Sequence, residues 1–255
     1  MTTFFTHTTN SVGDNMWSLQ YLRKQAILYP QHRFVHAVPY HLLAPLIDVV
    51  ADLRNLSLID SNYKPHYSKD IWVNSGNFSE THPDKTNVVK VLIDFYARFS
   101  NRNGMESALR HPEDLLYDYP ALDKAKYTQN FDFLIVNSKP MSGQFTDVDA
   151  IDDLIGELVD KGHSVVTTSQ SRHNVTCTEL AGLSLTQIGN LSRNCRNILG
   201  IATGPMWATF NVWNAELTEL RLLLSKYDTI FMSPNTEHAS TVEAARVILR
   251  DRGLL

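Results

Sequence analysis

The chain has 255 residues, of which 43% are hydrophobic and 20% charged, and its formal net charge is −4. This composition is ordinary for a globular protein, and the length suits one large domain or two small ones. The acidic balance argues against the clustered basic surface with which proteins bind nucleic acid, so we expect no nucleic-acid partner.

The N-terminal segment, residues 1–9, lacks the basic stretch and long apolar core of a secretory signal peptide. No apolar run approaches the roughly 18–20 residues of a membrane helix, so no transmembrane segment is predicted. Two cysteines, Cys177 and Cys195, are too few for a disulfide scaffold and lack metal-ligand spacing, so we expect reduced thiols. These features together predict a cytoplasmic protein.

In the first half, predicted strands and helices alternate. A β-prone run at 3–9 comes first, followed by a turn at 10–15 and a helix that begins near residue 16. The further predicted elements are a strand at 33–38, a helix at 40–53, strands at 56–59 and 70–73, and an amphipathic helix at 87–99. Residues 100–128 are polar and contain proline, which is typical of a linker with a short helix.

The second half begins again with a strand at 131–136, whose continuous apolar run predicts burial on both faces. A helix at 147–161 follows and ends at Gly162, in the position where glycine commonly terminates helices. The remaining predicted elements are strands at 163–168 and 180–183, a helix or turn at 185–193, a strand at 198–202, a helix at 215–225, a strand at 229–232 and a helix at 241–252.

This alternation predicts an α/β fold with parallel sheets and right-handed crossovers. The two similar halves favour two Rossmann-like domains, residues 1–126 and 127–255, whose last helix crosses back to the first domain. Parallel sheets bind ligands beyond the carboxyl ends of their strands. Two such domains facing each other would place both sets of loops at one cleft.

A glycine and an aspartate follow the first predicted strand, in the segment Gly13-Asp14-Asn15. Gly13 can adopt a crowded or left-handed backbone conformation, and Asp14 then lies at the start of a helix. A carboxylate in that place could act as a general base toward an acceptor hydroxyl. Helix capping by Asp14 is the alternative interpretation, because Asp is a favoured N-cap residue.

Polar residues also follow the first two strands of the second half. Ser138 and Lys139 supply a hydroxyl and a positive point charge, which suit a phosphate, although a solvated loop would look the same. Thr168 and Ser169 follow the next strand and could reach a ribose or a base. A polar loop that leads into a turn is the alternative for this second pair.

After the strand at 198–202 comes the turn Thr203-Gly204-Pro205-Met206. A strand, a glycine-containing turn and a helix start can bind an anion, because the free N–H groups of the first helical turn point at one spot. Gly204 allows close approach to a phosphate, and Pro205 suits the first helical position. Ordinary strand-to-helix turns share this pattern, so the turn alone leaves both interpretations open.

Other chemistries lack support in the sequence. Asp147-Val148-Asp149 resembles a metal-binding Asp-x-Asp pattern, but with Asp152 and Asp153 it lies at a helix start, where acidic residues are favourable. No histidine or cysteine spacing predicts a catalytic zinc, and the glycine motifs of dinucleotide-binding and P-loop proteins are absent. We therefore expect no metal and no bound cofactor.

Taken together, the Gly-Asp turn, the segment 180–185 and Thr203-Gly204-Pro205-Met206 resemble the heptosyltransferase-type (ADP-heptose:lipopolysaccharide) family of GT-B glycosyltransferases. The resemblance implies that Asp14 is the base, and that Ser138, Lys139 and the turn contact phosphate. It also implies no metal, because lysine and a helix N-terminus stabilise the departing diphosphate. Ala202 and Trp207 stand where the family usually has Asp and His.

The resemblance implies a metal-independent, inverting glycosyltransferase that moves a sugar from a nucleotide sugar, its co-substrate, to a glycan hydroxyl. The second half would hold the donor and the first half, including the loop with Gly13 and Asn15, the acceptor. A nucleotide-sugar epimerase of the same fold and a non-catalytic nucleotide-binding module are the alternatives.

Overall fold

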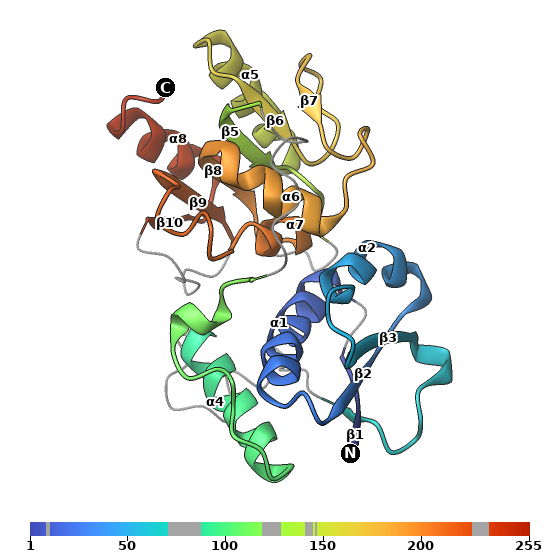
Figure 1. Cartoon of the computed structure of the whole chain (residues 1–255). Coiled ribbons are helices and arrows are strands. Elements are labelled where there is room, and N and C mark those ends of the chain that lie inside the picture. The colour runs from blue at the N-terminus through green and yellow to red at the C-terminus, as the bar shows by residue number, and fades with distance from the viewer. Residues whose placement is uncertain (9–10, 71–87, 119–128, 141–144, 146, 226–234) are drawn as a thin grey trace. The chain divides into compact units, whose positions relative to one another are not determined.

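The computed structural model describes residues 1–8, 11–70, 88–118, 129–140, 145, 147–225 and 235–255. The chain divides into two compact units, Met1–Pro120 and Ala121–Leu255, each with its own parallel sheet (Figure 1). The predicted α/β class with two parallel sheets is therefore confirmed. The predicted boundary at 126/127 lies outside the described residues, and the acceptor and donor roles of the two halves stay predictions.

The first unit contains a four-stranded sheet in the order β3-β2-β1-β4. Its strands are β1 (Thr3–His7), β2 (Arg33–Val38), β3 (Leu56–Asp60) and β4 (Lys69–Asp70), and all pairs are parallel. Its helices are α1 (Val12–Leu28), α2 (Tyr40–Val50) and α4 (Val88–Arg102), with 3-10 turns η1 (Ser61–Tyr63) and η2 (Pro112–Leu115). Residues 71–73 of the fourth predicted strand lie outside the described residues.

The segment after α4 is part of the first core, so its interpretation as a polar linker is wrong for residues 105–117. Its apolar side chains Met105, Leu109, Leu115, Leu116 and Tyr117 are all buried. Backbone groups of the segment are also bound by α1, since the side chain of Gln25 accepts from the N–H of Ala108 at 2.8 Å and donates to the carbonyl of Glu106 at 2.9 Å. The apolar residues of this segment do not recur at the spacing of a helix or a strand, so the sequence pattern gives no sign of this packing.

The second unit contains a six-stranded parallel sheet in the order β10-β9-β8-β5-β6-β7. Its strands are β5 (Phe131–Val136), β6 (Val165–Thr167), β7 (Thr176–Cys177), β8 (Cys195–Ile201), β9 (Leu220–Leu224) and β10 (Thr236–Ala239). Its helices are α5 (Val148–Asp160), α6 (Leu185–Leu191), α7 (Gly204–Ala208) and α8 (Val242–Asp251), with the 3-10 turn η4 (Ser192–Asn194). Gly162 follows α5 with a φ of +88°, as its predicted role requires.

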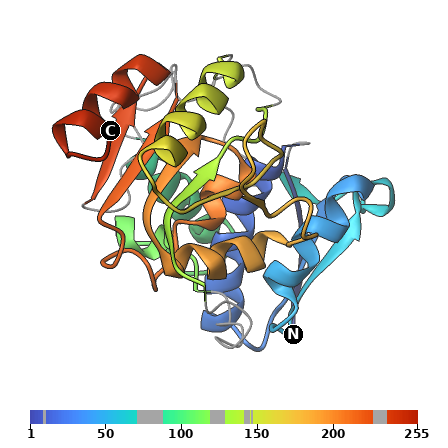
Figure 2. The same ribbon diagram turned by 90° about the horizontal axis from the view of Figure 1, so that it is seen from above.

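Alternate residues of the central strands supply the two faces of the second sheet. Phe133 and Ile135 of β5 join Leu199 of β8 in a core with α5 and α8. Figure 2 shows α5 and α8 on one side of this sheet and α6 on the other. The sheet is therefore covered on both faces. Polar groups can gather where the strands begin, which we call the amino edge of the sheet, and where they end, which we call its carboxyl edge.

Two predicted elements of the second unit are wrong. The expected helix at 215–225 is instead a turn followed by β9, whose residues are all buried between β8 and β10. Leucine and glutamate favour a helix locally, but burial within the sheet overrides that preference. The expected strand at 180–183 is a turn, and the predicted strand at 229–232 lies outside the described residues.

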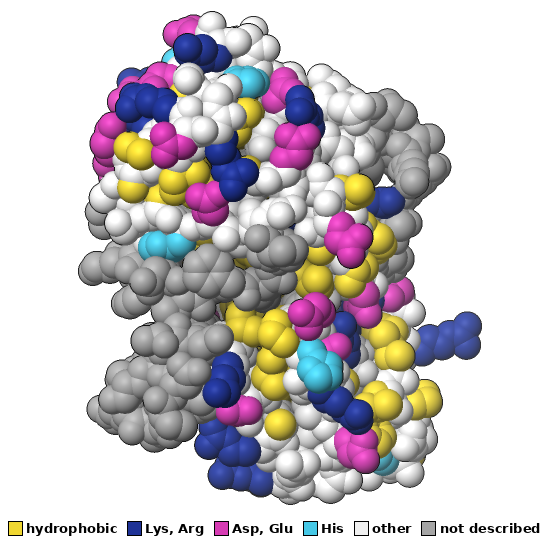
Figure 3. All heavy atoms as spheres, turned by 90° about the vertical axis from the view of Figure 1, so that its left-hand side faces the viewer, with side chains coloured by type: hydrophobic (Ala, Val, Ile, Leu, Met, Phe, Trp, Pro, Cys, Tyr) yellow, Lys and Arg dark blue, Asp and Glu magenta, His cyan; other side chains and the backbone are white. Residues whose placement is uncertain are grey.

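Helix α8 packs against α5, β9 and β10 of its own unit, and its predicted crossing to the first half stays a prediction. Its arginines form ion pairs with neighbouring carboxylates: Arg246 with Glu157 at 2.7 Å and with Glu243 at 3.3 Å. Basic and acidic side chains are accordingly intermixed on this face (Figure 3). Among the described helices, none is both long and apolar enough to cross a membrane.

Candidate functional site

Three neighbouring strands of the second sheet end in polar segments. Strand β5 lies between β8 and β6, and Val136 is opposite Gly200 while Ile135 is opposite Thr167. The segments that follow these strands therefore leave the sheet at the same carboxyl edge. They carry the residues predicted to bind the donor: Ser138, Lys139, Thr168, Ser169 and the turn Thr203-Gly204-Pro205-Met206.

The hydroxyl groups after β5 and β6 form one cluster. The Oγ of Ser138 lies 2.9 Å from the Oγ1 of Thr168 and 3.2 Å from the Oγ of Ser169. Thr168 is buried, while Ser138 and Ser169 are half-buried at the edge. The structure thus brings together three residues that the sequence placed in two separate loops.

Asn137 holds this cluster, and sequence reasoning did not single it out. Its side-chain oxygen accepts from the backbone N–H of Ser169 at 2.8 Å, and its amide nitrogen donates to the carbonyl of Ser169 at 3.1 Å. Its own backbone N–H donates to the Oγ1 of Thr168 at 3.2 Å. Asparagine can satisfy a donor and an acceptor of a neighbouring loop at once, and its position directly after a buried strand was the available signal.

Lys139 follows the cluster and is exposed. Among the described residues, no carboxylate lies within ion-pair distance of its ammonium group, whereas most arginines of this unit are paired. A flexible lysine beside hydroxyl groups suits a phosphate, to which it contributes a point charge.

The predicted anion turn begins the short helix α7. Thr203 is the N-cap residue in an extended conformation, and its hydroxyl donates to the carbonyl of Ile201 at 3.3 Å instead of capping the helix. Gly204 and Met206 are buried, whereas Thr203 and Pro205 are half-buried, so the exposed part of the turn belongs to Thr203 and Pro205. Ala202 and Trp207, at the positions where the resembling family has Asp and His, are also buried, each 7% exposed.

A buried arginine supports the end of α7. The guanidinium of Arg221 donates to the carbonyl of Thr209 at 3.0 Å and to the Oδ1 of Asn214 at 2.8 Å. It also lies 4.3 Å from the ring centroid of Phe210, a cation–π contact. The exit of the turn is therefore fixed from inside the unit.

The acidic residues of α5 hold the loop that follows Ser169. Asp152 accepts from the Oγ of Ser171 and the Nε of Arg172, both at 2.5 Å, and Asp153 accepts from Arg172 at 2.6 Å. Partial burial raises the pKa of Asp152, but these hydrogen bonds outweigh it and hold the pKa below its ordinary value. No group of three potential metal ligands occurs among the described residues.

In the first unit, Asp14 is the third residue of α1 and is half-buried. The helix begins at Val12, within the predicted turn, and Ser11 is its N-cap: the Oγ of Ser11 accepts from the N–H of Asp14 at 3.1 Å. The interpretation of Asp14 as the N-cap is therefore wrong. The expected special conformation of Gly13 is also wrong, because Gly13 lies in the helix and has no positive φ.

Asn15 is predicted to lie in the loop on the acceptor side, but its side chain is fully buried and cannot contact an acceptor. Its Oδ1 accepts from the Nε2 of His36 at 3.1 Å. From α4, Tyr96 packs against the same helix, and burial, followed by the nearby Asp14 carboxylate, raises the pKa of its phenol. At this helix start, the half-buried Asp14 therefore supplies a carboxylate, whereas Asn15 is part of the buried interior.

No protein-family model matches the sequence, and no curated protein matches it. The structure is similar to that of a family 9 glycosyl transferase from Veillonella parvula, with 9% identity, a TM-score of 0.55, and coverage of 99% of this chain and 88% of that one. It is similar to E. coli ADP-heptose LPS heptosyltransferase II, with 13% identity, a TM-score of 0.54, and coverage of 100% and 98%. It is also similar to E. coli heptosyltransferase WaaC with ADP, with 12% identity, a TM-score of 0.50, and coverage of 99% of this chain and 98% of that one.

The chain has the GT-B fold. Both units take part in these matches, because nearly the whole chain is covered. This confirms the predicted fold, while the identities are too low to carry site residues from one protein to another.

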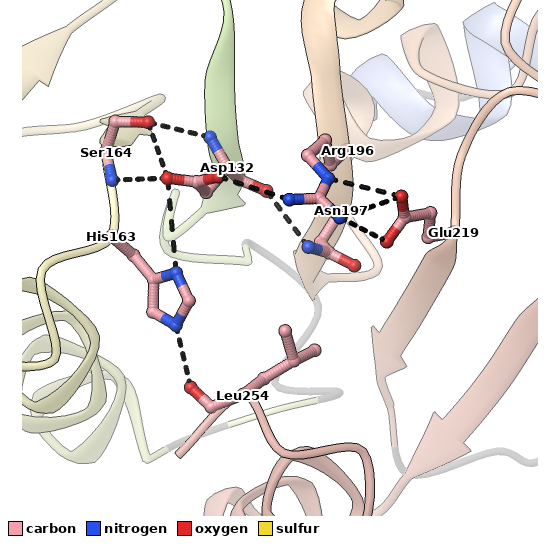
Figure 4. Close-up of polar contacts among 7 residues, drawn as sticks. All are labelled: Asp132, His163, Ser164, Arg196, Asn197, Glu219 and Leu254. Atoms are coloured by element: carbon pink, nitrogen blue, oxygen red, sulfur yellow. Dashed lines mark hydrogen bonds and ion pairs between the residues drawn. The ribbon is translucent and has the colours of Figure 1, made fainter.

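The amino edge of the second GT-B sheet holds a separate polar cluster, shown in Figure 4. Asp132 accepts from the N–H and Oγ of Ser164 at 2.9 and 2.8 Å, and these bonds lower its pKa. Arg196 pairs with Glu219 at 3.0 Å, and the Nε2 of His163 lies 2.9 Å from the carbonyl oxygen of Leu254. These groups satisfy one another at the edge opposite the predicted donor residues, so we assign them a structural role.

Proposed function

We propose that this protein is a metal-independent, inverting glycosyltransferase that transfers a sugar from a nucleotide sugar to a hydroxyl group of a glycan. The observation that carries the proposal is the cluster of Ser138, Thr168 and Ser169, with Lys139 beside it, at the carboxyl edge of a GT-B sheet. Open α/β sheets bind their ligands at this edge. The matches to glycosyltransferase structures support the same class of function.

In this proposal the second unit binds the nucleoside diphosphate. Lys139 balances the negative charge of the diphosphate, and the N–H of Gly204, in the turn that begins at Thr203, donates to its oxygens. The N–H of Thr203 already donates to the carbonyl of Ile201 at 2.7 Å, and Pro205 has no N–H. The hydroxyls of Ser138, Thr168 and Ser169 contact the phosphates or the ribose. Because one matched structure is named as a complex with ADP, ADP is the first nucleotide to test.

The first unit supplies the base. The carboxylate of Asp14 takes the proton of the acceptor hydroxyl while the hydroxyl oxygen forms a bond to the anomeric carbon of the sugar. The bond between that carbon and the diphosphate oxygen breaks, and the nucleoside diphosphate leaves with the electron pair. A single displacement of this kind inverts the anomeric centre, and the departing charge is stabilised by Lys139 and the backbone N–H of Gly204.

The test measures the release of nucleoside diphosphate from a panel of nucleotide sugars in the presence of candidate oligosaccharide acceptors. We expect acceptor-dependent release with one donor. Asp14→Asn should lower kcat by about 10²–10⁴-fold, the contribution typical of a positioned general base, and leave nucleotide affinity unchanged.

Full activity of Asp14→Asn would remove the assigned base. Tight nucleotide binding without turnover of any donor would identify a nucleotide-binding module instead, and conversion of the donor sugar without transfer would identify an epimerase.

A further inference from the structure

A chain of buried polar side chains lies beneath the helix start that carries Asp14. Thr6 of β1, His36 of β2 and Asn15 of α1 are each no more than 1% exposed. The Oγ1 of Thr6 lies 2.9 Å from the Nδ1 of His36, and the Nε2 of His36 lies 3.1 Å from the Oδ1 of Asn15. Buried polar groups are almost always hydrogen-bonded, so this hydrogen-bond network is an ordered part of the unit's interior.

The donors and acceptors along this chain can be assigned. Burial, and then the nearby His7, lowers the pKa of His36 to about 3, so the imidazole is neutral at neutral pH with one N–H. The amide nitrogen of Asn15 already donates to the carbonyl of Ser11 at 2.8 Å, which makes its oxygen the acceptor. The proton therefore lies on the Nε2 of His36, and the Thr6 hydroxyl donates to Nδ1.

The hydrogen-bond network continues from Asn15 through Ser11 to Asp14. The carbonyl of Ser11 accepts from Asn15, and its hydroxyl accepts from the backbone N–H of Asp14 at 3.1 Å. Ser11 is thus held by Asn15 and in turn holds the residue that the proposed function makes the base. One continuous path of hydrogen bonds links two strands of the sheet to the first turn of α1.

We propose that Asn15 and His36 are positioning residues, which fix the first turn of α1 to the sheet and so set where the Asp14 carboxylate lies. This inference rests on the proposed function of Asp14. A general base must be held within a fraction of an ångström of its place, and a shift of about 1 Å can cost about 10²-fold in rate. A packed helix alone would leave its first turn free to fray, because the first N–H groups lack helical partners.

The first experiment compares Asn15→Ala with Asn55→Ala. Asn55 is the matched control, since its amide donates to the carbonyls of Ala26 and His32 at the opposite end of α1, at 2.9 and 3.1 Å. Asn15→Ala should lower kcat about 10- to 100-fold at saturating donor and leave the KM for the nucleotide sugar unchanged. Asn55→Ala should leave both values unchanged although it also removes amide hydrogen bonds.

The second experiment keeps or removes the donor at residue 36. Glutamine can place an N–H near the position of Nε2, so His36→Gln should retain most of kcat, whereas His36→Leu should match Asn15→Ala. Backbone hydrogen exchange over residues 12–16 is measured on the same proteins. It should be faster in Asn15→Ala and His36→Leu than in the wild type and unchanged in Asn55→Ala.

Equal losses of kcat in Asn15→Ala and Asn55→Ala, or unchanged exchange over residues 12–16, would overturn the inference. Failure of the proposed function is a different result, namely no turnover by the wild type. The exchange measurement then decides alone whether Asn15 and His36 fix the helix start.

Discussion

The two edges of the second sheet both carry polar side chains, but of different kinds. At the amino edge, Arg196 forms ion pairs with Glu219 and Asp132, and Asp132 also accepts hydrogen bonds from Ser164 (Figure 4). At the carboxyl edge, Ser138 and Thr168 are neutral hydroxyls, and Lys139 has no carboxylate within ion-pair distance among the described residues. The amino edge is therefore complete without a ligand, whereas the carboxyl edge has charge and hydroxyl groups to offer one.

The two edges therefore differ in whether their charged groups have partners within the fold. Clusters of titratable residues often mark active sites, and the amino edge, with a lowered pKa at Asp132, would attract attention first. The pKa of Asp132 is lowered by hydrogen bonds from Ser164, which is a member of the same cluster. Whether the charged groups have partners, more than how many there are, distinguishes the two edges.

Among the variants that test the difference between the two edges, the largest effect is expected on nucleotide binding. Lys139→Ala should weaken ADP binding about 10- to 100-fold, equivalent to about 1.4–2.8 kcal/mol, because it removes the positive charge that the proposed function assigns to the diphosphate. Arg196→Ala is the control, since it removes one positive charge from the amino edge. Calorimetric titration of both variants checks this, and equal losses of affinity would show that the two edges do not differ in function.

Gly200 tests how closely β8 must approach β5 beneath the carboxyl edge. A Cβ at this position would lie 2.4 Å from the carbonyl oxygen of Val136 and 2.5 Å from its Cβ. Gly200→Ala should lower the free energy of unfolding by about 1–3 kcal/mol, because backbone must move to relieve the overlap. Denaturant unfolding measures the change, and an unaltered midpoint would contradict this account of the strand ends.

The smallest effect is expected at the amino edge. Asp132→Asn should lower the free energy of unfolding by about 1 kcal/mol and leave ADP affinity unchanged, because its hydrogen bonds to Ser164 serve the fold alone. The pKa of Asp132 is lowered in the folded state, so its contribution is fully present above the unfolded value of about 3.9 and is lost as the pH falls through the lower folded value. Unfolding curves of the variant and wild type should converge at acid pH, and a constant difference would contradict the assignment.

Local pattern predicted the parts of the fold whose signal is local. The apolar run of β5 and the period of α5, ended by Gly162, gave both elements within a residue. The residues predicted to bind the donor directly follow such strands, and parallel pairing brings them to one edge. Ser138, Thr168 and Ser169 form a cluster for that reason.

Features that depend on tertiary contacts were not predictable in this way. Strand β9 has a helix-favouring sequence and becomes a strand only because β8 and β10 enclose it. The burial of Asn15 depends on His36, which is 21 residues away in sequence. Gly13 and Asp14 were expected in a turn, but capping by Ser11 extends α1 over both.

A crystal structure of the protein with ADP bound is the decisive experiment for the proposed donor site. We expect the diphosphate at the carboxyl edge of the second sheet, with its oxygens within hydrogen-bond distance of Lys139 and of the N–H of Gly204. A diphosphate bound elsewhere, with Lys139 extended into solvent, would contradict the proposed site.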